Sequence, residues 1–246
     1  MTSSQPPLWR RCLAELLGTG LLVTVVVGSG IAAEQLSPAD AGVQLFHNTT
    51  ATVFGLTVLI LVLGPVSGAH FNPAVSLADW LLGRGSGAGL TLPEVGAYSA
   101  AQLAGAAGGS VLANVMFDVE VSFSATERAG GGLLVGEVVA TAGLILLVFA
   151  LARTSRGLLA APAVGAYIGA ACWFTSSTSF ANPAVTFGRM FSDTFAGIAP
   201  GSVPGFVGAQ LVGVAVALGL VLLLFPAAGR AADDVVVPHP ALAEDS

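Results

Sequence analysis

The sequence predicts an all-α membrane protein, in which six transmembrane helices and two shorter, re-entrant half-helices form an inverted repeat. Three observations predict this fold. Of the 246 residues, 54% are hydrophobic and only 9% are charged, about a third of the charged share of a soluble domain, and the mean hydropathy is +0.86. Apolar segments of about spanning length recur along the chain. Short motifs of the first half also return, in the same order, in the second half.

Six apolar segments are the predicted transmembrane helices. They lie at about 11–33, 45–63, 94–116, 133–152, 159–174 and 205–225. A helix needs roughly 20 apolar residues to cross the hydrocarbon core, so six spans leave about half of the chain for other elements. The spacing of Gly105 with Gly109 and of Gly165 with Gly169 is typical of helices that pack closely in lipid.

The arginines indicate how the chain is oriented. All eight basic residues are arginine, and six of them lie on one side of the predicted membrane: Arg10, Arg11, Arg84, Arg153, Arg156 and Arg230. Positive residues favour the cytoplasmic side, so we expect a multi-pass protein of the cell membrane with both termini in the cytoplasm. Residues 1–8 are expected to be a short tail, and the acidic segment 229–246 is expected to be disordered.

Three matched elements define the internal repeat. Glu15-Leu-Leu-Gly-Thr19 recurs as Glu137-Val-Val-Ala-Thr141, His70-Phe-Asn-Pro-Ala-Val75 as Phe180-Ala-Asn-Pro-Ala-Val185, and Ala101-Gln-Leu-Ala-Gly105 as Ala209-Gln-Leu-Val-Gly213. Each copy holds three spans, an odd number, so the second copy must be inverted relative to the first. The predicted membrane domain is 9–228, with repeats at about 9–117 and 130–228.

Two stretches, 64–82 and 175–191, are too short and too interrupted to cross a membrane. They contain the boxes Asn72-Pro73-Ala74 and Asn182-Pro183-Ala184. Asparagine is a strong N-cap and proline is favoured at the first helical position, so each box predicts a half-helix that begins inside the membrane. Irregular backbone at this depth must be buried or line a water-filled cavity. The two N-termini, each with about half a positive charge, are expected to meet near the midplane, with both asparagine amides free to donate hydrogen bonds there.

Over about residues 9–228 the chain resembles the aquaporin, or major intrinsic protein, family. The resemblance rests on both Asn-Pro-Ala boxes, Ser67-Gly68-Ala69-His70, the pairs Glu15/Thr19 and Glu137/Thr141, and Gln102 with Gln210. It implies the aquaporin-like fold and a homotetramer in the lipid bilayer, with a pore in each protomer. It also implies a ladder of backbone carbonyls from Gly68, Ala69, His70 and Phe71 and from Thr178, Ser179, Phe180 and Ala181. In the family the two glutamates brace these loops, and we assign Glu15 and Glu137 that role rather than proton transfer.

Such a pore suits neutral solutes. Carbonyls on one wall replace the hydration of a polar molecule but not that of an ion, and the two positive helix ends repel cations and protons. We therefore expect a passive channel for water and small uncharged solutes, not an enzyme, with no cofactor or metal. The net charge of −6 and the lack of a basic run disfavour a nucleic-acid partner.

The positions that set selectivity in the family differ here. Counting without gaps from the boxes places them at Thr52, Ala170, Ser179 and Val185, and another alignment would move Ala170 towards Cys172. Water-selective members carry an arginine where this chain has Val185. Without that guanidinium, five donors and a fixed charge are lost. The sequence therefore predicts a wide, uncharged constriction for glycerol-like polyols and metalloid hydroxides. The Thr/Val pair resembles bacterial aquaporins associated with arsenic resistance, which suggests arsenite or methylated arsenicals.

Arg189 has two interpretations. It follows Val185 by four residues, on the same helical face, so its charge can lie at the outer mouth of the pore. Alternatively, it pairs with Asp193, itself four residues further on, at the outer surface.

Three other functions share part of this pattern. A water-selective aquaporin shares every feature except the filter. A secondary transporter with inverted repeats needs intramembrane charges for coupling ions; only Glu15 and Glu137 qualify, and both have a structural explanation. An intramembrane serine hydrolase would use Ser67 and His70, but two residues on one re-entrant loop do not provide a dyad with an oxyanion hole.

Overall fold

A computed structural model describes residues 6–85 and 87–225, and within these ranges the chain is all-helical. The α-helices are α1 (Leu8–Leu36), α2 (Ala41–Ser67), α3 (Pro73–Gly83), α4 (Leu92–Met116), α5 (Gly131–Arg153), α6 (Ala160–Phe174), α7 (Pro183–Gly188) and α8 (Val203–Leu224). Short 3₁₀ helices are η1 (Gly157–Leu159), η2 (Arg189–Phe191) and η3 (Pro200–Ser202). The acidic segment predicted to be disordered, 229–246, lies outside the described residues.

The six long helices correspond to the six predicted spans. Five of them are long and apolar enough to cross a membrane. The exception is α4, because it is rich in alanine, glycine and serine. These small residues have a packing reason: a Cβ added to Gly105 would lie 2.2 Å from the carbonyl oxygen of Leu16, and one added to Gly109 would lie 2.1 Å from that of Gly20. The low hydropathy of α4 thus follows from its close contact with α1.

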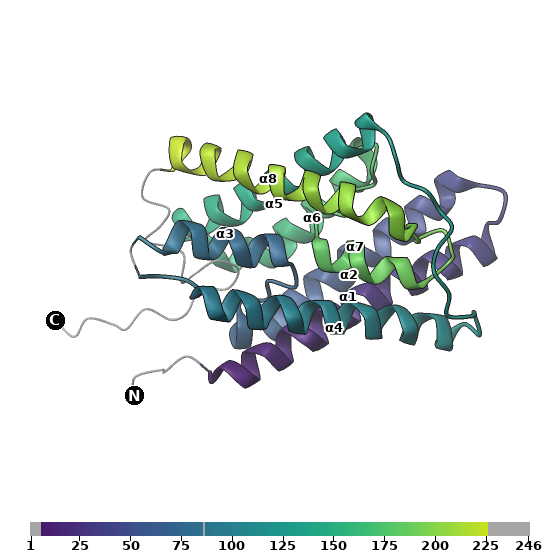
Figure 1. Ribbon diagram of the computed structural model, residues 1–246, viewed down its shortest axis with the longest axis horizontal. Coiled ribbons are helices and arrows are strands. Elements are labelled where there is room, and N and C mark those ends of the chain that lie inside the picture. Colours follow the sequence, from purple (N-terminus) through teal and green to yellow (C-terminus); the bar gives the residue numbers. More distant parts are fainter. Residues whose placement is uncertain (1–5, 86, 226–246) are drawn as a thin grey trace.

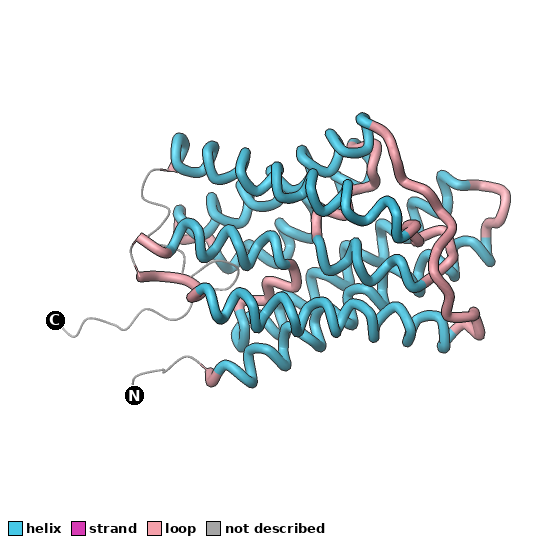
Figure 2. Tube along the Cα trace, viewed as in Figure 1, coloured by secondary structure: helices cyan, strands magenta, loops and turns pink. Residues whose placement is uncertain are grey.

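The helices are arranged as two related halves. In Figure 1 the long helices run along one axis, with α3 in the left half of the bundle and α7 in the right half. Helix α1 packs most extensively against α4, as α5 does against the equivalent helix α8, and α2 packs against α6 to join the halves. Figure 2 shows loops at both ends of the bundle and also among the helices, where the chain enters α3 and α7.

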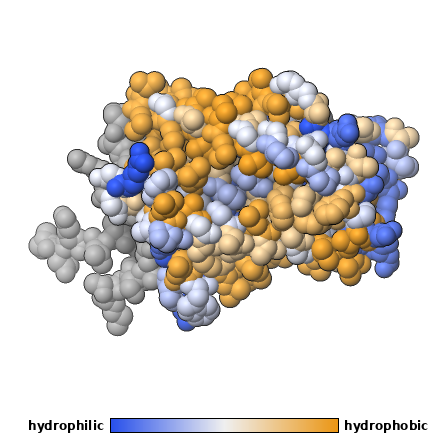
Figure 3. All heavy atoms as spheres, in the orientation of Figure 1, coloured by the Kyte–Doolittle hydropathy of each residue, from blue (hydrophilic) through white to orange (hydrophobic). Residues whose placement is uncertain are grey.

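The outer surface matches a lipid environment. Large apolar side chains face outward along the helices, for example Phe54 (68% exposed), Val62 (64%) and Leu223 (80%). In Figure 3 hydrophobic atoms cover most of the side of the bundle, and hydrophilic atoms gather towards its ends. An apolar surface of this extent is characteristic of a membrane-spanning protein. The start of α1 and the end of α8 lie at the same end of the bundle (Figure 1), as six crossings require.

Candidate functional site

Both half-helices begin at the predicted asparagines. The side-chain oxygen of Asn72 accepts a hydrogen bond from the N–H of Ala74 at 2.9 Å, with Pro73 in the first turn. Asn182 accepts in the same way from the N–H groups of Ala184 and Val185, at 2.9 and 3.2 Å. The unpaired N–H groups that begin every helix are thereby partly satisfied inside the membrane.

The two asparagine amides also tie the halves together. Nδ2 of Asn72 donates to the carbonyl oxygen of Ala181 at 2.8 Å, and Nδ2 of Asn182 donates to that of Phe71 at 2.7 Å. The expectation that both amides are free to donate into the pore is therefore only half right. An amide group has two N–H donors, so one of each pair holds the opposite loop while the other remains for a solute.

The loops before the half-helices hold an unusual backbone. Six residues in equivalent positions have a left-handed conformation, with φ between 48° and 83°: Gly68, Ala69, Phe71, Thr178, Ser179 and Ala181. This conformation costs a residue with a Cβ about 1–2 kcal/mol, so it persists only where the surroundings impose it. The strain is repeated in both halves, which indicates that it belongs to the site.

Glu15 imposes this geometry on the first loop. Its carboxylate is fully buried and accepts hydrogen bonds from the N–H groups of His70 at 3.0 Å and Phe71 at 2.7 Å. Ser67 Oγ and Gln102 Nε2 donate to the same carboxylate at 2.6 and 2.7 Å. A buried carboxylate needs such donors, and here they turn the loop N–H groups away from the cavity.

Glu137 does the same in the second loop. It is also fully buried, and it accepts from the N–H groups of Phe180 at 2.9 Å and Ala181 at 2.8 Å and from Gln210 Nε2 at 2.6 Å. The contacts agree with the bracing role assigned to both glutamates. Neither carboxylate lines the cavity.

Two hydroxyl residues complete the brace and were not singled out from the sequence. Ser76 Oγ accepts from Gln102 Nε2 at 3.2 Å, and Thr186 Oγ1 accepts from Gln210 Nε2 at 2.9 Å. Thr186 Oγ1 in turn donates to the carbonyl oxygen of Asn182 at 2.8 Å. Their equivalent positions, four residues after each asparagine, are the sequence pattern that would have identified them.

A cavity of roughly 770 Å³, open solvent included, lies between the half-helices. Its polar lining consists of Asn48, Thr52, His70, Asn72, Cys172, Thr178, Ser179, Asn182 and Arg189, and its apolar lining includes Leu22, Val26, Leu56, Ile60, Val75, Leu144, Val148, Val164, Ile168 and Val185. Ala69, Phe71, Phe180 and Ala181 also line it, so seven of the eight residues of the predicted carbonyl ladder line the cavity and only Gly68 does not. The lining therefore combines residues of the two loops with mainly apolar residues of the long helices.

The structure corrects one predicted filter residue. Thr52, Ser179 and Val185 line the cavity, whereas Ala170 is exposed on the outside of α6. The side chains of α6 that face the cavity are Val164, Ile168 and Cys172, spaced four apart as one helical face requires. Ala170 lies two residues from Cys172, about half a turn away, so ungapped counting placed this position on the wrong face.

The side chains of Ser67 and His70 do not form a catalytic pair. Ser67 Oγ donates to Glu15 at 2.6 Å. His70 Nδ1 is 3.0 Å from Ser76 Oγ, and its ring meets that of Tyr98 edge-on at 5.5 Å. Both side chains therefore hold the first loop, and the hydrolase hypothesis has no support.

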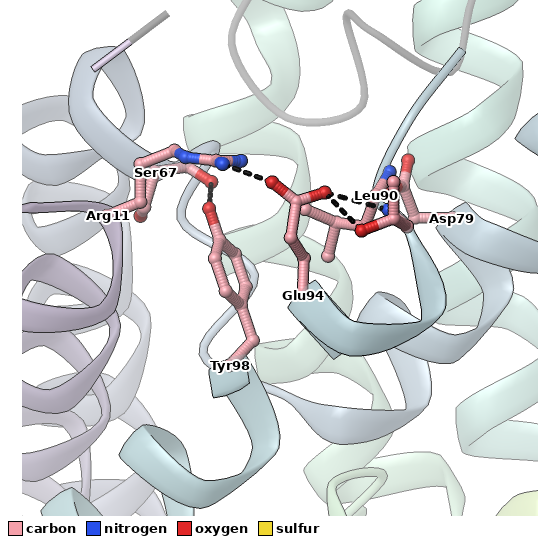
Figure 4. Close-up of polar contacts among 7 residues, drawn as sticks. Arg11, Ser67, Asp79, Leu90, Glu94 and Tyr98 are labelled. Atoms are coloured by element: carbon pink, nitrogen blue, oxygen red, sulfur yellow. Dashed lines mark hydrogen bonds and ion pairs between the residues drawn. The ribbon is translucent and has the colours of Figure 1, made fainter. Parts of the chain in front are cut away.

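A polar network fixes the end of the bundle where α1 begins (Figure 4). Arg11 forms an ion pair with Glu94, and the hydroxyl of Tyr98 donates to the carbonyl oxygen of Ser67 at 2.9 Å. Asp79, buried within α3, accepts from the N–H of Leu90 at 2.7 Å. These contacts join α1 to α4, α4 to the end of α2, and α3 to the loop that follows the half-helix.

Arg189 does not lie at the outer surface, where its predicted pairing with Asp193 would place it. It is 5% exposed and lines the cavity. Asp193 instead accepts from the N–H of Ala125 at 2.8 Å. The predicted pairing with Asp193 is therefore wrong. Because α7 ends at Gly188 and η2 ends at Phe191, Arg189 and Asp193 do not lie on one continuous helix, so their four-residue spacing does not place them on one face.

Opposed half-helices that meet within a helical bundle, with a cavity between them, define a membrane channel of the inverted-repeat class. The comparisons agree. A family model described as major intrinsic protein matches residues 2–180, and the chain belongs to this family.

Similar proteins include channels named for glycerol. The chain is 52% identical over 223 residues to Aquaglyceroporin AqpS of Rhizobium meliloti (strain 1021), covering 89% of this chain and 92% of that protein. It is 32% identical over 225 residues to the glycerol uptake facilitator protein of Pseudomonas aeruginosa, covering 79% and 78%. The solved structure of the aquaglyceroporin from Plasmodium falciparum aligns with a TM-score of 0.66 and 19% identity over 92% of this chain and 100% of that chain. At that identity the structural match shows the fold.

Proposed function

We propose that this protein is a passive transmembrane channel for water and small uncharged solutes such as glycerol. The observation that carries the proposal is the cavity between the two half-helix N-termini, lined by residues of both loops and by apolar residues of the long helices. A polar solute regains hydrogen bonds along the loops, and the apolar residues offer an ion nothing to replace its water.

The positive N-terminal ends of the two half-helices, which meet at the cavity, repel cations. Helices α3 and α7 both begin at the cavity, at Asn72 and Asn182, and each N-terminus contributes about half a positive charge. The lining residues include no aspartate or glutamate. Protons and metal cations therefore meet an uncompensated positive region, so the solutes that pass are neutral.

The filter residues favour solutes larger than water. Thr52, Cys172, Ser179 and Val185 line one cavity, and all have small or medium side chains. The names of the similar proteins, an aquaglyceroporin and a glycerol uptake facilitator, support this solute class. We extend the proposal to metalloid hydroxides such as arsenite and to methylated arsenicals, whose neutral forms present hydroxyl groups as glycerol does.

A water-selective channel is the second candidate, because Arg189 lines the cavity and can narrow it. The assembly and location also belong to the proposal: a homotetramer in the cell membrane, with both chain ends on the cytoplasmic side. The exposed apolar helix surfaces and the positive-inside distribution of arginine support it.

Stopped-flow measurement on proteoliposomes tests the proposal. We expect fluxes of water, glycerol and arsenite well above those of empty liposomes. Val185→Arg should reduce the two solute fluxes and retain water flux. Val212→Arg, on the exposed outer surface, is not used as a control because a charge there would disturb insertion into the bilayer. Glu127→Gln, at an exposed loop position, is the matched control and should leave all three fluxes unchanged. Wild-type protein that passes water alone would support the water-selective alternative.

A further inference from the structure

Arg189 brings a formal charge to a pore wall that the filter residues leave uncharged. It begins η2, directly after half-helix α7, and it is 5% exposed. Val185 lies one helical turn earlier, closer to Asn182, and lines the same cavity. The charge therefore lies further towards the end of the bundle where α7 ends, beyond the level of Val185.

Two contacts fix the guanidinium. Its Nε donates to the carbonyl oxygen of Ala196, and its central carbon lies 3.6 Å from the centroid of the Phe180 ring. A cation over a ring face is held by the ring quadrupole. The two terminal nitrogens have no hydrogen-bond partner among the described residues, and neither is sealed from accessible space. Four N–H donors thus remain for a solute.

A second arginine, Arg128, fixes the same loop that holds Arg189. Arg128 donates to the carbonyl oxygens of Gly197 at 2.8 Å and Phe195 at 3.2 Å, and its guanidinium carbon lies 5.1 Å from the Phe180 ring centroid. Three consecutive carbonyls, 195–197, therefore accept from the two arginines. Arg128 does not line the cavity, so it supports the loop without meeting a solute.

Asn48 supplies an acceptor in the same part of the cavity. It lies one helical turn before Thr52 on α2 and lines the cavity. Its Nδ2 donates to the carbonyl oxygen of Val26 at 2.7 Å and to Ser29 Oγ at 3.0 Å. The side-chain oxygen has no partner among the described residues and is not sealed. The amide is thus oriented with its acceptor available.

Asn48 and Ala196, whose carbonyl oxygen accepts from Arg189, both lie next to Gly30 of α1 and so at one level of the bundle. A Cβ added to Gly30 would lie 3.0 Å from Cβ of Ala196 and 3.7 Å from Nδ2 of Asn48. The carbonyl that holds Arg189 and the amide of Asn48 therefore flank the same turn of α1. A donor and an acceptor lie one helical turn beyond the level of Val185 and Thr52.

We propose that Arg189 and Asn48 form a second polar layer of the pore, in which Arg189 excludes cations and donates hydrogen bonds to solute oxygens. The solutes it selects are neutral molecules with several hydroxyl groups. This inference rests on the proposed channel function and adds a filter that does not need an arginine at position 185.

Matched variants test the layer in proteoliposomes, with Na⁺ leak, water flux and the ratio of glycerol to propane-1,3-diol flux as readouts. Arg189→Gln should raise Na⁺ leak ~10-fold or more, because a unit charge at contact distance is worth several times the thermal energy even near a protein surface. It should lower the glycerol ratio about threefold, the effect of one hydrogen bond. Arg153→Gln, which removes an exposed arginine, should change none of the three readouts.

A second pair of variants keeps the test decisive if Arg189→Gln does not fold. Asn48→Asp leaves Arg189 in place but adds a carboxylate at its level, so Na⁺ leak should rise. Asn48→Leu should lower the glycerol ratio and leave Na⁺ leak unchanged. Folded Arg189→Gln and Asn48→Asp channels with wild-type Na⁺ leak would overturn the inference. If wild type passes water but no glycerol, the proposed solute class fails, while Na⁺ leak still decides the role of Arg189.

Discussion

Replacing Glu137 tests whether the braced loop holds the site together. Its Oε1 accepts from Phe180 N–H, and its Oε2 accepts from Ala181 N–H and Gln210 Nε2. Glutamine has one acceptor oxygen, so Glu137→Gln leaves at least one buried donor facing an NH₂ group. An unsatisfied buried donor costs about 1–3 kcal/mol. Alanine leaves all three donors unsatisfied, about 3–9 kcal/mol before relaxation, which is comparable to the total stability of a typical protein.

Thermal unfolding of the detergent-solubilised protein and water flux in proteoliposomes measure this loss. We expect Glu137→Gln to unfold at a lower temperature and conduct less water, and Glu137→Ala to lose flux altogether as the left-handed loop relaxes. Glu127→Gln removes the same charge at an exposed position and serves as the control. A Glu137→Gln protein with wild-type stability and flux would refute the bracing role.

Three further predictions concern packing, charge and the loop after α3. Gly109→Val should lower the unfolding temperature strongly, because its Cβ would lie 2.1 Å from the backbone oxygen of Gly20, whereas Gly108→Ala, with no atom within 4 Å of an added Cβ, should be tolerated. Asn182→Asp should raise proton leak, measured with a pH-sensitive dye inside liposomes, because it places a carboxylate between the two helix N-termini, and an unchanged leak would argue against their electrostatic barrier. Asp79→Ala should release Leu90 and speed proteolysis at residues 84–91, and wild-type cleavage rates would show that this hydrogen bond does not hold the loop.

Much of the fold could be predicted from sequence because its determinants are local. Hydropathy locates helices over about 20 residues at a time, and Asn-Pro fixes a helix start through capping and the proline φ angle. The repeated motifs then supply the inverted arrangement. Even α4, whose small residues reduce its hydropathy, corresponds to the apolar segment predicted at 94–116, and its Gly105–Gly109 spacing indicates the close packing that the structure shows.

The rest of the site depends on tertiary contacts that no local rule contains. The face of α6 that meets the cavity depends on how many residues separate its end at Phe174 from Asn182, so counting back selected Ala170 in place of Cys172. The Arg189–Asp193 prediction assumed a helix that had already ended. Asn48 was not identified because its neighbours in space, Val26 and Ser29, belong to another helix.

The central claim is passive conduction of neutral solutes between opposed half-helices. Its most direct test is glycerol flux measured in proteoliposomes with and without an imposed proton gradient, while internal pH is recorded on the same vesicles. A channel predicts glycerol flux that rises linearly with the glycerol gradient, is unchanged by the proton gradient, and is accompanied by no proton entry above that of empty liposomes. Saturable glycerol flux that follows the proton gradient and acidifies the vesicles would contradict the account and favour a coupled transporter.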